Sequence, residues 1–157
     1  MTETVLLSHD RTFPVEVERA FDEVLPLDLV VLFDRRHLAI PQVRQVRDQT
    51  GTWGTPGQTR TIALADGGTM RETLDEVVRP ERFGYRIGDV TGPMRPLISA
   101  LDGEWRFEPA GTGVRITWAW TVHPAGRLGT AAMPVFGRMW QGYARQAFDN
   151  LERLLVR

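Results

Sequence analysis

Residues 102–120, DGEWRFEPAGTGVRITWAW, are the most informative segment for the fold because they contain two alternating runs joined by a turn. Apolar and polar residues alternate in each run, which is typical of a strand with one buried face. We therefore predict strands over Leu101–Glu108 and Val114–His123, which pair antiparallel because so short a connection, PAGTG, joins them. The apolar face of this pair carries Trp105, Phe107, Trp118 and Trp120.

Three more strands are predicted on the N-terminal side of this pair, again as hairpins. They span Gln58–Leu64, Met70–Val78 and Arg82–Gly88. The residues between them, Ala-Asp-Gly-Gly at 65–68 and Arg-Pro-Glu at 79–81, are of the types that favour tight turns. The segment Asp89–Ser99 contains two prolines and is predicted to be an irregular loop.

The beginning of the chain predicts one strand, two short helices and a further strand. The first strand covers Thr4–Ser8 and extends toward Phe13. Pro14 suits the start of a short helix that Pro26 ends, and Leu27–Phe33 forms a second one. In Ile40–Thr50 valines alternate with arginines, which indicates a strand with one solvent-exposed face.

The C-terminal residues change to a helical period. From Val135 to Leu155 apolar residues recur at spacings of three and four, which predicts a long amphipathic helix. Pro134 is placed in its first turn, with a shorter helical turn from Leu128 before it. The whole chain, 1–157, is therefore predicted to be one α+β domain with a curved antiparallel sheet of about seven strands. Such a sheet around a helix leaves a volume that suits a small ligand.

The composition excludes several kinds of chemistry. All nineteen basic residues are arginine, and there is no lysine or cysteine, which removes Schiff-base and thiolate catalysis. The three histidines lack metal-site spacing, and we expect neither a metal nor a cofactor. A net charge of −1 does not favour nucleic acid. We expect a cytoplasmic protein without stable membrane insertion, and a homodimer is compatible with the sequence.

Several segments carry a family resemblance. They are the helix pair in 14–33, GQTR at 57–60, GGTMRETLDEVVRPERFGYRI at 67–87, the stretch at 102–120, and RQAFDNLERLL at 145–155. On these residues the chain resembles the START and birch-pollen-allergen-like (SRPBCC) superfamily, and within it the polyketide cyclase/dehydrase-like branch. The resemblance implies a helix-grip fold and a START-like domain that binds a hydrophobic ligand, lipids included. It implies no universal catalytic motif, because that superfamily contains carriers, hormone sensors, chaperone activators and cyclases.

Glu72 is the strongest candidate for a functional polar group. It has the same strand parity as Met70 and Leu74, so it faces inward if they do. An inward carboxylate is costly unless it is paired or protonated, so Glu72 is a candidate general base or hydrogen-bond acceptor for a ligand. The alternatives are that a twist or bulge of the strand turns Glu72 outward, or that an arginine pairs with it structurally. Tyr85 also faces inward and could orient a ligand through its hydroxyl, or simply be a core tyrosine.

The predicted ligand wall is mostly aromatic, although ordinary core packing explains each member equally well. It consists of Met70, Leu74, Tyr85, Trp105, Trp118, Trp120, Phe136, Met139, Trp140 and Tyr143. Arg95 is a candidate lid residue, and the alternative is a solvated arginine on a surface loop. His37 is a candidate proton shuttle, and the alternative is a structural or solvent-facing histidine. The other arginines are interpreted mostly as solubilising, outward-facing residues.

Three functions remain open from the sequence. The first is a binding protein for a small hydrophobic ligand, aromatic or polyketide-like. The second is a cyclase/dehydratase-type enzyme without a covalent intermediate, in which Glu72 or His37 moves a proton and Tyr85 or Arg95 stabilises an enolate-like oxygen. The third is an interaction module without a free cavity. Convergent ionisable groups would favour the enzyme, an apolar wall the carrier, and a filled interior the module.

Overall fold

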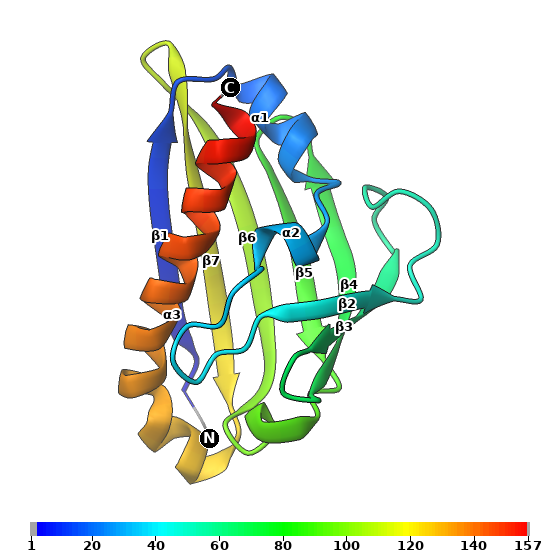
Figure 1. Cartoon of the computed structure of the whole chain (residues 1–157), viewed down its shortest axis with the longest axis vertical. Helices are drawn as coiled ribbons and strands as arrows, with labels where there is room; N and C mark the ends of the chain where they lie inside the picture. The colour runs from blue at the N-terminus through cyan, green and yellow to red at the C-terminus, as the bar shows by residue number, and fades with distance from the viewer. Residues whose placement is uncertain (1–2, 157) are drawn as a thin grey trace.

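The computed structural model describes residues 3–156 and is built on one sheet of seven antiparallel strands (Figure 1). Residues 1–2 and 157, the ends of the predicted domain, lie outside the described residues. The spatial order is β1-β7-β6-β5-β4-β3-β2, so every strand after β1 pairs with its neighbour in sequence. The strands are β1 (Val5–Phe13), β2 (Val43–Arg47), β3 (Thr59–Leu64), β4 (Thr69–Val78), β5 (Arg82–Gly88), β6 (Ile98–Ala110) and β7 (Gly113–Pro124).

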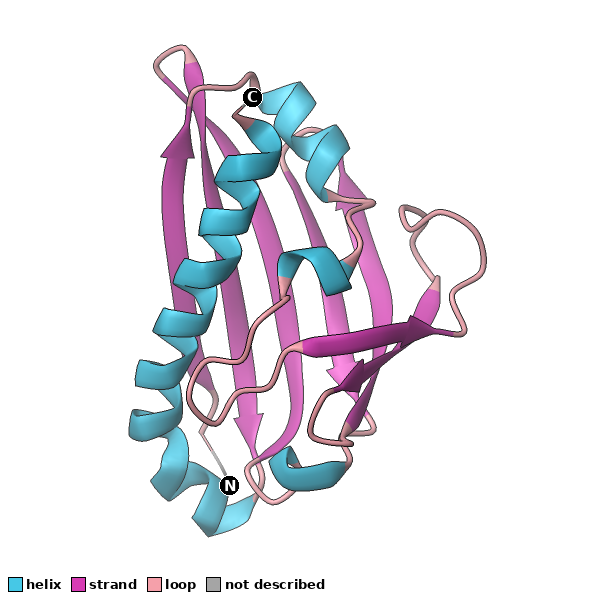
Figure 2. Ribbon diagram, viewed as in Figure 1, coloured by secondary structure: helices cyan, strands magenta, loops and turns pink. Residues whose placement is uncertain are grey.

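Three α-helices lie over the same face of this sheet (Figure 2). They are α1 (Val17–Val24), α2 (Leu29–Leu32) and α3 (Gly126–Leu155), and a short 3-10 helix, η1 (Gly92–Met94), joins β5 to β6. Asp28 caps α2, because its carboxylate accepts a hydrogen bond from the Val30 N–H at 3.0 Å. The element order and the helix-grip arrangement agree with the expectation from the sequence.

Helix α3 differs from the prediction because it runs through Pro134 without a break. A separate turn at Leu128 and a helix beginning at Pro134 were expected, whereas one helix begins at Gly126. Proline inside a helix removes one backbone hydrogen bond. Here Pro134 is exposed while Met133 and Phe136 are buried, so packing on both sides of the proline holds the helix together.

The predicted loop Asp89–Ser99 is shorter than expected, because β6 already begins at Ile98. Ile98 is buried and lies opposite Pro124 of β7. The Ala125 N–H donates to the Leu97 carbonyl at 2.9 Å, which extends the pairing to the start of α3. The strand is therefore prolonged by contacts that only the folded chain provides.

The helices divide the inner face of the sheet between them. Helix α3 packs against β1 and β7, at one edge, while α1 packs against β6 and α2 against β2. The amphipathic pattern of α3 explains its position, because Trp140, Ala147 and Phe148 all point toward the sheet and are buried. The middle of the sheet, from β3 to β6, is left to face the segment that contains α2.

Candidate functional site

A cavity lies between the middle of the sheet and the segment that runs from α1 to β2. Its volume is about 70 Å³, which is room for several water molecules. The wall is apolar apart from a few groups, and among the described residues Arg60 and Glu72 are the only charged ones on it. The aromatic part of the wall consists of Phe33, Phe83, Tyr85, Trp105, Trp118, Trp120 and Tyr143.

The two charged residues form one buried ion pair. Arg60 of β3 lies directly opposite Glu72 of β4, and its Nε donates to Glu72 Oε1 at 2.8 Å. Arg60 is 4% exposed and Glu72 3% exposed. Burial raises the pKa of Glu72, and the charge and hydrogen bond of Arg60 oppose that rise. The inward orientation predicted for Glu72 is thus observed, together with the arginine partner that was its structural alternative.

The loop between β2 and β3 holds Arg60 from the other side. The Arg60 guanidinium carbon lies 3.8 Å from the centroid of the Trp53 ring, a cation–π contact. Its Nη1 also donates to Gln49 Oε1 at 3.3 Å. Gln58 shapes this loop, because its side-chain oxygen accepts from the N–H groups of Gly54 and Thr55. Arg60 is therefore fixed by the loop as well as by Glu72.

The Tyr85 hydroxyl is the second polar group on the wall. Its oxygen accepts hydrogen bonds from Trp118 Nε1 at 2.9 Å and from Trp120 Nε1 at 3.0 Å. Two donors occupy both lone pairs of the oxygen, so the Tyr85 hydrogen is left as a donor, and no acceptor for it is found in residues 3–156. Burial raises the pKa of Tyr85, and the nearby Glu72 carboxylate raises it further, so the hydroxyl stays protonated.

Gly103 makes this arrangement possible because glycine has no side chain. Gly103 of β6 lies opposite both Tyr85 of β5 and Trp120 of β7. A Cβ at Gly103 would lie 2.0 Å from the Tyr85 ring, well inside van der Waals contact. The ring therefore lies over the glycine, and its hydroxyl reaches the two indole groups from there.

Substituting Gly103 by alanine is expected to displace the Tyr85 ring. We expect the free energy of unfolding to fall by about 1–3 kcal/mol, as for other overpacked sites. The pKa of Tyr85 should also fall, because a displaced ring loses some of its burial, and this can be followed by ultraviolet titration of the two tyrosines. Gly84→Ala is the matched control, since its Cβ would meet only a carbonyl oxygen at 3.6 Å. Equal effects of both substitutions would contradict this role of Gly103.

The segment opposite the sheet is anchored by polar side chains of α3. Tyr143 donates its hydroxyl hydrogen to the Pro41 carbonyl at 3.0 Å. Asn150, which is buried, donates to the Leu32 carbonyl at 2.9 Å and to Asp34 Oδ1 at 2.8 Å. These contacts hold both ends of the loop that follows α2, and so position that side of the cavity.

Six of the ten predicted wall residues line the cavity, and four do not. Met70, Tyr85, Trp105, Trp118, Trp120 and Tyr143 are on its wall. Leu74 is fully buried in β4 but outside the wall, and Trp140 lies behind the tryptophans, with its ring 4.7 Å from that of Trp118. Phe136 and Met139 are also outside it, because α3 covers the β1 edge rather than the middle of the sheet.

The candidates Arg95 and His37 lie away from the cavity wall. Arg95 is exposed after η1, and its neighbour Met94 is the residue that reaches the cavity. The His37 ring lies on Gly142 of α3, where a Cβ would be 2.0 Å from Nε2, and its Nδ1 is 3.4 Å from Gln146 Nε2. Neither side chain is therefore on the wall of the cavity in this structure.

Arg60 is the residue that sequence reasoning missed. It has the same strand parity as Ile62 and Leu64, which also line the cavity, so the pattern that identified Glu72 also pointed to Arg60. Arg60 was not identified as a wall residue because most of the arginines were expected to face solvent. Leu25, Leu27 and Leu29 also line the cavity, but no sequence pattern pointed to them. Their place on the wall depends on how the segment that contains α2 folds back over the sheet.

These observations describe a helix-grip domain with a cavity whose wall is aliphatic and aromatic apart from a few polar groups. The family model described as polyketide cyclase/dehydrase and lipid transport matches residues 4–156. The chain therefore belongs to this family, which confirms the resemblance seen in the sequence. No match to a curated protein was found.

Solved structures support the same fold at low sequence identity. Ginseng major latex-like protein 151 from Panax ginseng is 9% identical, with a TM-score of 0.72 over 99% of both chains. Ara h 8.0201 is 16% identical, with a TM-score of 0.63 over 94% of this chain and 97% of the other. DynU16, encoded in the dynemicin biosynthetic locus, is 15% identical, with a TM-score of 0.61 over 96% of this chain and 46% of that longer chain. At such identities the likeness concerns the fold alone.

Proposed function

We propose that this protein binds a small, uncharged hydrophobic ligand, aromatic or polyketide-like, in the cavity between the sheet and the α2 segment. The observation that carries the proposal is the cavity wall, which is aromatic and aliphatic apart from one compact polar cluster. Ligand pockets usually combine apolar surroundings with a few placed polar groups that orient the ligand. A filled interior, as in an interaction module, would leave no such space.

The polar cluster supports a ligand that offers both a donor and an acceptor. Tyr85 has an unused hydrogen, and Glu72 uses one carboxylate oxygen for Arg60, while its other oxygen has no hydrogen-bond partner within residues 3–156. A hydroxyl group on the ligand can donate to Glu72, and an oxygen can accept from Tyr85. Since Arg60 already neutralises Glu72, an anionic ligand would bring an uncompensated charge into the cavity.

The size of the cavity limits what can enter without a change of shape. A volume of about 70 Å³ is small beside the roughly 300–1,000 Å³ of typical ligand pockets. The sheet side is a continuous hydrogen-bonded ladder, whereas α2 has only four residues and its Leu29 and Val30 are half-buried. We therefore expect a ligand of several rings to be admitted by outward movement of α2 and the loops beside it.

The proposal is tested first by native mass spectrometry of freshly purified protein, which should reveal a retained small molecule. Calorimetric titration then compares 2-naphthol, naphthalene and 2-naphthoate, of which 2-naphthol should bind most tightly and 2-naphthoate least. Tyr85→Phe and Glu72→Gln should each weaken 2-naphthol binding by about tenfold, the worth of a hydrogen bond in a buried site. Neither should change naphthalene binding by more than about twofold.

Arg86→Gln is the control, because Arg86 is exposed on the opposite face of β5. It should leave the affinities for all three compounds unchanged. Tight binding of 2-naphthoate, or equal 2-naphthol affinities for wild type and both cavity variants, would contradict the proposed polar anchor. Absence of binding of any aromatic compound would contradict the ligand-binding function itself.

A second candidate function is cyclase/dehydratase-type catalysis in the same cavity. The convergence of Glu72 and Tyr85 on one space favours it, since proton transfer and stabilisation of an enolate-like oxygen are their natural roles. The raised pKa of Glu72 brings it closer to the range of a general acid or base. Incubation with a poly-β-ketone substrate separates the two functions, because Glu72→Gln would abolish turnover in an enzyme and only reduce affinity in a carrier.

A further inference from the structure

The outer face of α3 carries exposed apolar side chains over its first three turns. Leu128 is 65% exposed and Val135 60% exposed. Ala131 and Pro134 lie between them and are exposed as well. Spacings of three, four and seven residues place these positions on one side of the helix, opposite the side that packs on the sheet. Such a contiguous apolar patch is unusual on a surface that faces only water.

The charged residues on this part of α3 all have one sign. Arg127 and Arg138 lie at its two ends and Arg145 follows two turns later, while residues 126–148 include no aspartate or glutamate. None of these three arginines forms an ion pair within residues 3–156. On the outer face of the sheet, in contrast, Arg86, Arg106 and Arg115 each pair with a carboxylate.

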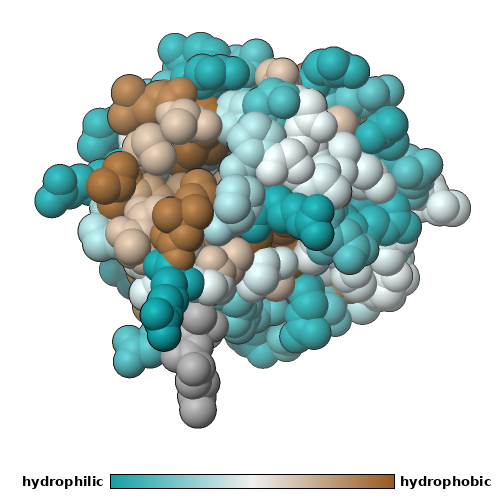
Figure 3. Space-filling view, turned by 90° about the horizontal axis from the view of Figure 1, so that it is seen from below, coloured by the Kyte–Doolittle hydropathy of each residue, from teal (hydrophilic) through white to brown (hydrophobic). Residues whose placement is uncertain are grey.

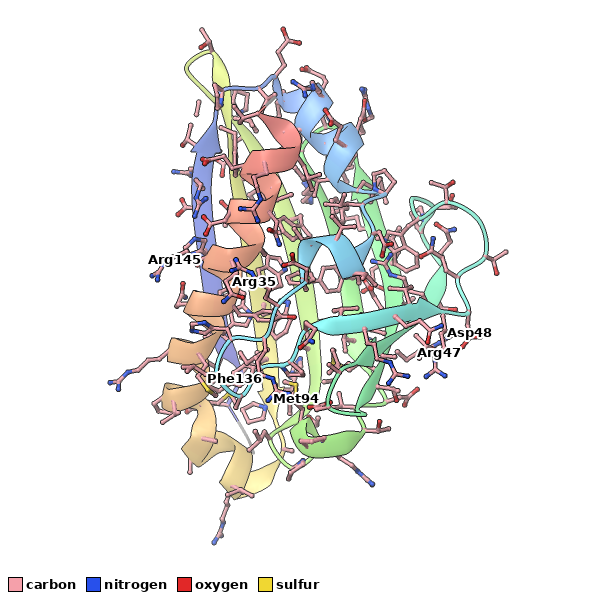
Figure 4. The ribbon with its side chains drawn as sticks, viewed as in Figure 1. Arg35, Arg47, Asp48, Met94, Phe136 and Arg145 are labelled. Atoms are coloured by element: carbon pink, nitrogen blue, oxygen red, sulfur yellow. The ribbon has the colours of Figure 1, made fainter. Side chains whose placement is uncertain are left out.

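The figures place this surface at one end of the molecule. Seen from below, hydrophobic residues gather on the side where α3 begins (Figure 3). Arg145 points away from the sheet, into the space outside α3 (Figure 4). We call the surface formed by Arg127, Leu128, Ala131, Pro134, Val135 and Arg138 the α3 stripe.

We propose that the α3 stripe docks the protein onto the surface of an anionic phospholipid bilayer. A helix that combines exposed apolar side chains with arginines lies flat in the boundary between headgroups and acyl chains, where both find favourable partners. Each arginine near an anionic surface adds about fivefold to the affinity. Among the described residues no helix has the length and apolar content needed to cross a bilayer, so the contact is peripheral.

Charge favours a lipid surface over a second copy of this chain. In a twofold dimer through the α3 stripe, the same patch would face itself, which brings the arginines of both copies together without a carboxylate between them. An anionic lipid surface instead supplies the missing negative charge over the whole length of the stripe. The proposal is independent of the ligand in the cavity, because none of the six stripe residues lies on the cavity wall.

Vesicle sedimentation of the full chain tests the proposal. Vesicles of phosphatidylcholine with 30% phosphatidylglycerol should bind the protein at 50 mM salt, and vesicles of phosphatidylcholine alone should bind it at least tenfold more weakly. Raising the salt to 500 mM should release most of the bound protein, because the Debye length shortens to a few ångströms. Absence of binding to the anionic vesicles would overturn the proposal.

Two double variants separate the contributions. Arg127→Gln with Arg138→Gln should weaken binding by about thirtyfold, and Leu128→Gln with Val135→Gln by at least tenfold, with unchanged thermal unfolding because all four residues are exposed. Arg44→Gln with Arg47→Gln is the matched control: it removes the same charge from β2, at the opposite edge of the sheet (Figure 4).

Equal losses in the α3 and β2 arginine variants would mean that net charge, not the stripe, governs binding, and would overturn the proposal. Light scattering of the free protein distinguishes docking on a bilayer from dimerisation through the α3 stripe. A dimer that dissociates on Leu128→Gln with Val135→Gln would assign the stripe to a second copy instead of a bilayer. A monomer in both forms supports the lipid surface.

Discussion

Replacing Arg60 by methionine is expected to lower the free energy of unfolding by about 3–5 kcal/mol, a typical loss when one partner of a buried ion pair is removed. For a protein of this length that corresponds to a fall in melting temperature of roughly 10 °C. The cause is Glu72, which would remain 3% exposed in an apolar wall with its carboxylate unpaired. Methionine keeps most of the side-chain volume, so the effect reports the lost charge rather than a hole.

The loss at Arg60→Met should depend on pH. Burial already raises the pKa of Glu72 in the native protein, and without Arg60 the pKa must rise further. A carboxyl group whose pKa is higher in the folded than in the unfolded state favours folding at low pH, and that contribution is lost as pH rises through the folded-state pKa. Urea unfolding should therefore show a large destabilisation at pH 8 and a smaller one near pH 5.

The double variant Arg60→Met with Glu72→Leu is the control for this interpretation. Removing both charges eliminates the unpaired carboxylate, so its stability should return close to that of the wild type and lose the pH dependence. A single variant as stable as the wild type at pH 8 would contradict the assignment of a buried, unscreened pair. So would a double variant less stable than the single one.

Trp118→Ala is expected to lower the free energy of unfolding by about 3–5 kcal/mol and to weaken ligand binding. The Trp118 side chain is fully buried, and its ring lies within about 5.5 Å of those of Trp105, Trp120 and Trp140. Truncation removes these contacts and one of the two donors to the Tyr85 hydroxyl. Chemical unfolding and calorimetric titration with 2-naphthol would measure the two effects.

Trp118→Phe separates packing from hydrogen bonding. It retains an aromatic ring but lacks the indole N–H, so we expect a smaller loss of stability, about 1–2 kcal/mol. Its affinity for 2-naphthol should fall less than that of the alanine variant. An unchanged melting temperature of Trp118→Ala would contradict the inward orientation of the Trp118 side chain, on which this part of the cavity wall depends.

Most of the fold could be predicted because its signals are local. The alternation in residues 102–120 predicted β6 and β7, and the turn residues at 65–68 separated β3 from β4. The strand predicted over Ile40–Thr50 and the helix predicted over Leu27–Phe33 are both shorter in the structure, as β2 and α2. Two further differences, the start of β6 at Ile98 and the passage of α3 through Pro134, depend on contacts with other segments. A local sequence pattern does not contain these contacts. In α3, for example, Pro134 predicts an interruption, and only the packing of neighbouring residues on the sheet keeps the helix continuous.

Strand parity predicts which strand side chains face the cavity. It does not predict which helix covers which part of the sheet, because that depends on contacts between elements. Parity placed Glu72 and Tyr85 inward, and the structure agrees. Phe136 and Trp140 satisfy the helical pattern equally well, but they meet the β1 edge of the sheet and leave the cavity to α2. A hydrophobic period identifies the buried side of a helix without saying which part of the sheet it covers.

The hairpin order, the apolar face of each strand and the residue types available for chemistry could all be read from the amino-acid sequence, because they depend on neighbours along the chain. The pairing of Arg60 with Glu72, and the two indole N–H groups that donate to the Tyr85 hydroxyl, became visible in the folded chain. The physical reason is that these contacts depend on register between strands and on the missing Cβ at Gly103, which lets one ring lie over the neighbouring strand.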